Sequence, residues 1–375
     1  MVLRCVRKIL APVSYFAVLL LLLLVPKLAL AADPPKAFLP GWTNVPGAQL
    51  PPGWSWPTLP SNPGGASTPG IPRPFDLGSL LSQTASCPPI EVAPKVFIPV
   101  PCTPGSAQHP KPSTRPPKYL PAGPLPAYVD LPKYGYDGPI KDQAQVGVCW
   151  AFALSTAAEN ALRRQGRHDF VSATHIIAAR SEKRLYASGL NGTAIAPDSA
   201  WPYDPVRACY LNDVLGYRDP WCEAAYHVPS GSWRSQPQIV AELRNADAWG
   251  TFRIREEELS GNTDEIANLI NQSRSVIADI SIDSRAWGHS IASSGTIADY
   301  LHADRGGHAV VLVAYTWSNG ERYFLIHNSW GTDWGKGGYA WIADRTLRRH
   351  ILGASIVDVY ARGFPVPSEG ATSGT

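Results

Sequence analysis

Three residues that lie far apart in the chain have side chains suited to nucleophilic chemistry: Cys149, His308 and Asn328. Cys149 follows a glycine-containing turn and opens a segment rich in strong helix formers, so it is predicted in the first turn of a helix. Unpaired backbone N–H groups and the positive end of the helix dipole favour the nucleophilic thiolate there. A nucleophile also needs a base and a group that orients the base. His308 and Asn328 are the candidates for these two roles.

One helix and two strands are expected to position these residues. The helix begins at the cysteine and is expected to stop at Gly166. His308 stands at the mouth of the apolar, β-branched run 309–315, which predicts a buried strand. Asn328 follows a second predicted strand, 323–326, and precedes a turn rich in glycine and tryptophan. The base and the orienting group are therefore expected at the ends of two strands.

The sequences around the three residues resemble the motifs of the papain-like cysteine peptidases. The first is Gln143-Ala-Gln-Val-Gly-Val-Cys-Trp-Ala-Phe152, with a glutamine six residues before the cysteine. The others are Gly307-His-Ala-Val310 and Asn328-Ser-Trp-Gly-Thr-Asp-Trp-Gly-Lys-Gly-Gly-Tyr339. The cysteine, histidine and asparagine follow in the family's order and at its separations, and the resemblance covers residues 126–363.

The resemblance implies an α+β fold of two subdomains with the active-site cleft between them. The left subdomain would be helical and carry the cysteine, and the right one would be an antiparallel β-sheet or barrel carrying the histidine and asparagine. The residues agree, because the pattern is dominated by helices up to about residue 237 and favours strands after residue 252. Those strands are expected at 252–255, 275–282, 309–315, 323–326 and 338–342, with a helix at 263–272.

The resemblance also implies a role for each site residue. Cys149 attacks the substrate carbonyl, His308 holds the proton and later passes it to the leaving amine, and Asn328 orients His308. Gln143 donates its side-chain amide to the developing oxyanion beside the backbone N–H of Cys149. Trp330 covers the histidine and asparagine and excludes water. A further candidate for support of the site is Trp150, the residue after the nucleophile.

The substrate pocket is expected near three glycines, Gly147, Gly306 and Gly307. The glycines before the histidine suggest a roomy pocket that accepts a bulky apolar side chain. Many relatives have a second cysteine three residues before the nucleophile, bridged to a Cys-Asn-Gly-Gly segment that builds one wall of the groove. This chain has Val146 at that position and lacks the segment, so this wall is expected to differ.

Four regions are predicted along the chain. Residues 1–31 have the basic start, the apolar run and the small-x-small ending of an export signal, although an uncleaved membrane anchor is the rival interpretation. Residues 32–125 are rich in proline and expected to be largely irregular, because 25 of the 37 prolines lie between positions 33 and 130. This region is either a linker or a pro-segment. Residues 126–363 form the peptidase domain, and residues 364–375 a flexible tail.

Cysteine usage agrees with export. In an oxidising compartment the natural pairs are Cys87–Cys102 and Cys209–Cys222, each closing a short loop. Cys5 would leave with the signal, so Cys149 remains as an unpaired, reactive thiol. The sequence therefore predicts a secreted or cell-envelope protein whose contact with a membrane is limited to the signal segment.

Several other classes of function find little support. The net charge is +3 over 375 residues, with no basic run suited to nucleic acid. The remaining histidines lack the spacing of metal ligands, so we expect no metal and no cofactor. A monomer acting on a peptide or protein is expected. Two alternatives stay open: a catalytically silent binding or adhesion module of the envelope, and a transpeptidase or ligase that uses the same thioester.

Overall fold

The structure is a computed structural model that describes residues 90–93, 96–98, 115–186, 193–217, 219–288 and 291–361. The predicted export signal, the Cys87–Cys102 pair and the C-terminal tail lie outside the described residues. In the proline-rich region, β1 (Ile90–Ala93) and β2 (Val96–Ile98) form an antiparallel pair. Among the residues that are described, no helix is both long enough and apolar enough to span a membrane.

Helix α3 (Cys149–Arg164) begins at the predicted cysteine, and residues 151–162 are buried on every face. Such complete burial fits its many alanines, because small side chains let neighbouring elements approach closely. The helix ends as the sequence predicts. Arg163 and Arg164 lie in the last turn, and Gly166 adopts a φ of +78°, the left-handed conformation that glycine takes without strain.

The helical half of the domain surrounds one side of α3. It consists of α4 (Ala173–Tyr186), α5 (Pro205–Val214), α6 (Pro220–Tyr226), the 3-10 helix η1 (Ser232–Ser235) and α7 (Pro237–Trp249). Helices α5, α6 and α7 each begin with a proline, whose fixed φ and missing N–H suit the first helical position. The predicted Cys209–Cys222 disulfide is present and joins α5 to α6.

The other half is an antiparallel sheet with the strand order β4-β5-β10-β6-β7-β8-β9, and β3 pairs with β7. The strands are β3 (Tyr128–Asp130), β4 (Thr193–Ile195), β5 (Phe252–Glu258), β6 (Val276–Ser281), β7 (Gly307–Ser318), β8 (Glu321–His327), β9 (Tyr339–Ala343) and β10 (Ile351–Ala361). The helices α8 (Thr263–Asn271), α9 (Ile291–Ser294) and α10 (Asp344–His350) accompany it. The sheet is open, so of the two predicted forms it is a sheet and not a closed barrel.

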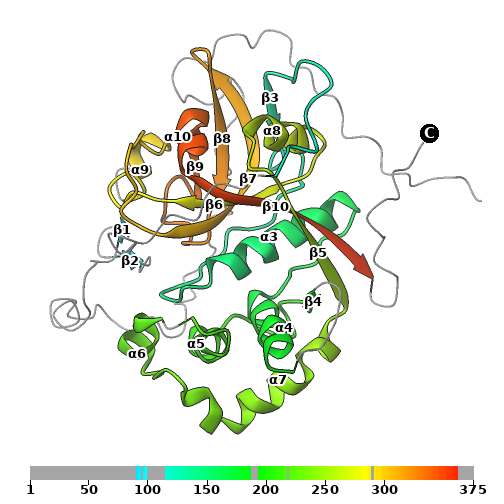
Figure 1. Cartoon of the computed structure of the whole chain (residues 1–375), viewed down its shortest axis with the longest axis vertical. Helices are drawn as coiled ribbons and strands as arrows, with labels where there is room; N and C mark the ends of the chain where they lie inside the picture. Colours follow the sequence, from blue (N-terminus) through cyan, green and yellow to red (C-terminus); the bar gives the residue numbers. More distant parts are fainter. Residues whose placement is uncertain are drawn as a thin grey trace, which may run out of the picture. The chain divides into compact units, whose positions relative to one another are not determined.

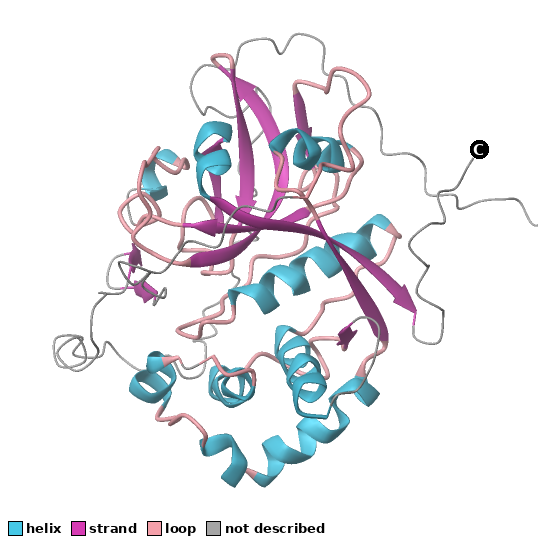
Figure 2. Ribbon diagram, in the orientation of Figure 1, coloured by secondary structure: helices cyan, strands magenta, loops and turns pink. Residues whose placement is uncertain are grey.

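The two halves confirm the predicted α+β division. Figure 1 shows α3 running between the helices α4 to α7 and the strands β6, β7 and β10. In Figure 2 most of the strands lie on one side of α3, and α4 to α7 lie on the other. The five predicted strands correspond to β5 to β9, and the predicted helix at 263–272 corresponds to α8. Strand β10, which pairs with both β5 and β6, was not predicted.

A buried ionic cluster ties the loop before α3 to the sheet. The Asp137 carboxylate accepts hydrogen bonds from His327 Nδ1 at 2.9 Å, Tyr339 Oη at 2.7 Å and Asn160 Nδ2 at 2.9 Å. The side chains of Asp137 and His327 are only 1% and 2% exposed. Burial alone would raise the pKa of Asp137, but His327 and the donated hydrogen bonds hold it below its usual range. His327 therefore has a structural role in this cluster.

We expect Asp137→Asn to lower the free energy of unfolding at pH 7 by about 3 kcal/mol, because three buried donors lose the carboxylate that accepts their hydrogen bonds. A carboxyl group whose pKa is depressed in the folded state stabilises the protein above its unfolded pKa of 3.8 and loses that effect as the pH falls. The variant should therefore show a weaker loss of stability below about pH 4. Urea unfolding across pH 3 to 7 measures both effects. Asp169→Asn, which removes a surface pair with Arg167, is the control and should cost under about 1 kcal/mol.

Candidate active site

Cys149 is the first residue of α3, is half-buried and is the free cysteine among the described residues. Among the described residues, no side chain caps this end of the helix, and the Ala151 N–H donates to the Val148 carbonyl at 2.9 Å. Burial raises the pKa of the Cys149 thiol to about 11, although hydrogen bonds from the N–H groups of Ala309 and Trp150 oppose this shift. The thiolate predicted from the helix terminus is therefore not the favoured form of this thiol taken alone, because desolvation outweighs the backbone donors.

His308 lies in the second position of β7 and is held by Asn328, the residue that follows β8. The His308 Nε2–H donates to Asn328 Oδ1 at 2.8 Å. The same oxygen accepts the Ser329 backbone N–H at 2.8 Å, which fixes the orientation of the Asn328 amide. The other ring nitrogen of His308, Nδ1, is therefore left to exchange a proton. Burial lowers the pKa of His308 to about 4, and the bond to Asn328 acts in the opposite direction.

Strand β7, which carries His308, also contacts the nucleophile. The backbone N–H of Ala309, the residue after His308, donates to the Cys149 sulfur. The nucleophile thus lies against the start of β7, although 159 positions of sequence separate it from the histidine. Burial favours the neutral form of each group by itself. A proton passed from one to the other creates two opposite charges side by side, so the pair is expected to titrate as a unit.

Gln143 is buried, and its side-chain amide is fixed at both ends. Its Oε1 accepts from Ser329 Oγ at 2.7 Å, and its Nε2 donates to the Val146 carbonyl at 2.8 Å. Its backbone N–H donates to the Ser329 carbonyl at 2.9 Å, and its own carbonyl accepts from Tyr203 Oη at 2.6 Å. Within the described part of the chain, the second Nε2 hydrogen has no acceptor. This hydrogen and the backbone N–H of Cys149 are the donors that the sequence assigned to an oxyanion.

Two tryptophans contact the imidazole, and a third packs against both of them. The Trp330 ring stacks on His308 with centroids 4.4 Å apart, and the Trp287 edge meets it at 5.8 Å. Trp334 packs against Trp330 at 5.7 Å and stacks on Trp287 at 5.9 Å. Trp330 therefore covers His308, and Trp287 is a second ring in contact with it. Trp150 does not join this cluster, because its ring lies beneath the Arg180 guanidinium at 4.8 Å.

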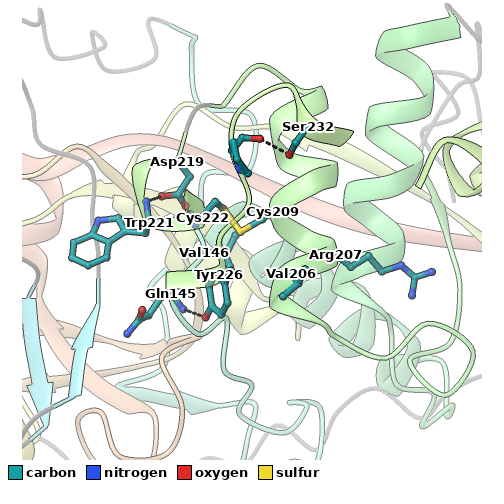
Figure 3. Close-up of a disulfide and its surroundings, with 12 residues drawn as sticks. Gln145, Val146, Val206, Arg207, Cys209, Asp219, Trp221, Cys222, Tyr226 and Ser232 are labelled. Atoms are coloured by element: carbon teal, nitrogen blue, oxygen red, sulfur yellow. Dashed lines mark hydrogen bonds between the residues drawn. A yellow bond between two sulfur atoms is a disulfide. The ribbon is translucent and has the colours of Figure 1, made fainter. Parts of the chain in front are cut away.

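The helical wall beside the nucleophile is held by α6. The Gly147 N–H donates to Asp219 Oδ2 at 2.7 Å, and the Gln145 N–H donates to Tyr226 Oη at 3.3 Å. Figure 3 shows Gln145, Asp219 and Tyr226 near the disulfide that joins α6 to α5. Because Val146 replaces the cysteine that relatives use as a bridge, these two hydrogen bonds provide the connection here. Asp219 was not predicted.

The two other predicted pocket residues lie on the sheet side. Gly306 is half-buried and Gly307 is exposed. A Cβ atom on Gly307 would lie 3.3 Å from Leu352 Cδ1, so Leu352 forms the neighbouring apolar surface. No cluster of metal-ligating side chains occurs in the part of the chain that the structure describes.

A thiol at a helix start, an imidazole held by an amide and a fixed glutamine amide together define a site with a nucleophilic cysteine. Residues 125–355 match the family model described as papain family cysteine protease, which covers more than half of the chain. The chain belongs to this family.

Curated relatives include cathepsin K of Mus musculus, which is 26% identical over 232 residues, covering 59% of this chain and 60% of the relative. A cathepsin L-like proteinase of Fasciola hepatica is 25% identical over 218 residues, covering 57% and 59%. The chain thus spans about three fifths of the length of these relatives. Among solved structures, digestive procathepsin L 3 of Tenebrio molitor larval midgut matches with a TM-score of 0.45 and 20% identity, over 67% of this chain and 75% of that one.

The coupling of Cys149 and His308 can be tested with His308→Ala. Without the imidazole the thiol must ionise alone, and burial holds its pKa high. We expect the rate of alkylation by iodoacetamide at pH 7 to fall by about 100-fold or more. The rate of the variant should keep increasing with pH beyond pH 9, whereas the unaltered protein should already react near neutral pH. The second-order rate measured from pH 4 to 10 gives the profile. His302 is exposed, so His302→Ala is the control and should keep the pH–rate profile of the unaltered protein. If His308→Ala also keeps that profile, the coupling of Cys149 to His308 is contradicted.

Proposed function

We propose that this protein is an exported cysteine endopeptidase that hydrolyses peptide bonds through a thioester on Cys149. The observation that supports this most directly is the arrangement of His308. One ring nitrogen is bonded to Asn328, and the next residue along the strand touches the Cys149 sulfur. Family membership points to the same chemistry. A binding module would not need the imidazole, the amide and the glutamine to be held around a free thiol.

In the proposed reaction, the Cys149 sulfur attacks the carbonyl carbon while the thiol proton passes to His308 Nδ1. His308 then protonates the leaving amine as the carbon–nitrogen bond breaks, and a water molecule hydrolyses the thioester with His308 as the base. Asn328 keeps the ring in place through both transfers. The stacked Trp330 excludes water from the bond between His308 and Asn328, which strengthens it.

The oxyanion formed by the attack would be bound by two donors. One is the backbone N–H of Cys149 at the uncapped start of α3, and the other is the free Nε2 hydrogen of Gln143. Because Ser329 and Val146 fix the Gln143 amide before substrate arrives, it needs no reorganisation during the reaction. Preorganised donors of this kind favour the transition state over the bound substrate.

Residues just before the predicted peptidase domain, which begins at residue 126, are bound to helix α8 of the sheet half. The backbone N–H groups of Lys118 and Tyr119 donate to the buried Glu265 at 2.7 and 3.0 Å, and Asn268 donates to the Tyr119 carbonyl at 2.9 Å. Leu120 is 52% exposed. A cut between Leu120 and Pro126, where we place any activation cleavage, would leave residues 115–119 attached to the sheet half by these bonds.

We place the protein outside the cytoplasm, on the strength of the signal-like start and the disulfide between α5 and α6. Its partners would be peptide or protein substrates, and it would act as a monomer. The apolar preference suggested by Gly306 and Gly307 is revised below.

The proposal is tested by titrating the purified protein with a thiol-directed epoxide and measuring hydrolysis of fluorogenic peptides. Cys149→Ala should lose both labelling and hydrolysis. Gln143→Ala should keep labelling but lower kcat by about 100-fold, the usual effect of removing one oxyanion donor. Gln145→Ala is the matched control. The contact of Gln145 with Tyr226 is made by its backbone N–H, which the substitution retains.

A folded Cys149→Ala protein that still hydrolyses peptides would remove the mechanism. Failure of the unaltered, folded protein to label or to hydrolyse any peptide would favour the binding module instead. Transfer of the acyl group to an added amine, faster than to water, would favour the ligase.

A further inference from the structure

Asp279 occupies an unusual position in the sheet. It lies on β6, which runs between β10 and β7 in the interior of the sheet, and its neighbours along the strand are buried. Asp279 itself is exposed. An antiparallel sheet can be packed on one face and solvated on the other. The residues two positions away on the same face, Ile277 and Ser281, are buried, so the exposure of Asp279 marks a local opening in that face.

The residues around Asp279 leave space above its carboxylate. Its partners across the sheet are Ala309 on β7 and Gly353 on β10, and residues directly opposite each other share a face. A Cβ atom on Gly353 would lie 3.6 Å from Asp279 Oδ2. The exposed Gly307 lies two positions from Ala309 and therefore on the same face. The carboxylate is thus bordered by residues with very small side chains.

This opening lies beside the nucleophile. The N–H of Ala309, directly opposite Asp279, donates to the Cys149 sulfur, and the negative charge of Asp279 raises the pKa of that thiol. A substrate held with its carbonyl at Cys149 therefore passes close to the Asp279 carboxylate.

The carboxylate of Asp279 has no hydrogen-bond or ion-pair partner among the described residues. Burial and the charge of Glu256 raise its pKa to about 6, although its side chain reaches solvent, a combination expected for a carboxylate inside a cleft. Glu256, on β5, is already occupied by Arg180 at 2.8 Å and Ser355 Oγ at 2.8 Å. Two negative charges, those of Asp279 and Glu256, thus lie in this region. The cation Arg180 pairs with Glu256 and not with Asp279.

We propose that Asp279 determines specificity, by binding a lysine or arginine side chain of the substrate close to the scissile bond. This inference rests on the proposed peptidase function and names its substrate class. Because Gly307 and Gly353 have no side chains, the basic group can reach the carboxylate. Leu352 provides apolar surface for the aliphatic stem of the lysine or arginine. The pocket predicted to be roomy and apolar therefore has a negatively charged end.

The test uses a positional library of fluorogenic peptides at pH 7.5, which varies each residue on both sides of the cleaved bond. We expect lysine or arginine to be preferred at one position. At that position, the ratio of kcat/KM for arginine over leucine should fall by about tenfold or more in Asp279→Asn. Glu258→Gln is the matched control, because it removes a charge from exposed β5 where Glu258 pairs with Arg115, and it should keep the ratio.

A pH series separates binding by the carboxylate from a packing effect. In the unaltered protein the ratio should decline as the pH falls below about 6, because Asp279 becomes protonated and loses its charge. In Asp279→Asn the ratio should not change with pH. The other titratable groups that face this region are Cys149, His308 and Glu256, with Arg180 as the cation, and both proteins share them, so their effects cancel in the comparison.

The failures are distinguishable. Hydrolysis without any preference for basic residues, or a preference that Asp279→Asn retains at every pH, would overturn this inference and leave the peptidase function standing. Absence of both hydrolysis and Cys149 labelling would overturn the two together.

Discussion

The short antiparallel pairing between residues 141–143 and 329–331 is the constraint on which the site depends. The Gln143 N–H donates to the Ser329 carbonyl at 2.9 Å, and the Gly331 N–H donates to the Lys141 carbonyl at 3.0 Å. Through its side chain and its own N–H, Ser329 also holds the amides of Gln143 and Asn328. The Gln143 amide, our proposed oxyanion donor, and the Asn328 amide that holds His308 are therefore fixed by one residue. A shift of this pairing would displace both at once.

Burial determines the protonation of Cys149 and His308. The same desolvation that favours a neutral thiol and a neutral imidazole also strengthens the hydrogen bond to Asn328 and the stacking of Trp330. The helix terminus, which the sequence suggested as the source of a thiolate, provides backbone donors instead. In the proposed reaction those donors stabilise an oxyanion that forms only in the transition state, more than they stabilise a thiolate before substrate binds.

Much of the site was predictable because its signals are local. The cysteine before an alanine-rich helix, the histidine at the start of an apolar strand and the asparagine at the end of another each stand at a boundary that neighbouring residues define. Asp279 and Trp287 lack such a signal. Asp279 lies within an apolar run, and its exposure depends on small residues that two distant strands place beside it. Strand β10 escaped prediction because Gly353, Ser355 and Asp358 interrupt its apolar pattern, and its pairing with β5 and β6 stabilises it.

The disulfide between α5 and α6 leaves the protein with two sulfur sites that need opposite oxidation states. Cys149 must be reduced to act, whereas Cys209 and Cys222 must stay joined so that α6 can present Asp219 to Gly147. Access resolves the conflict, because the bonded cysteines are 1% and 5% exposed and Cys149 is half-buried at the cleft. A mild reductant will therefore meet the catalytic sulfur first, and a strong one will activate the nucleophile while loosening the wall beside it.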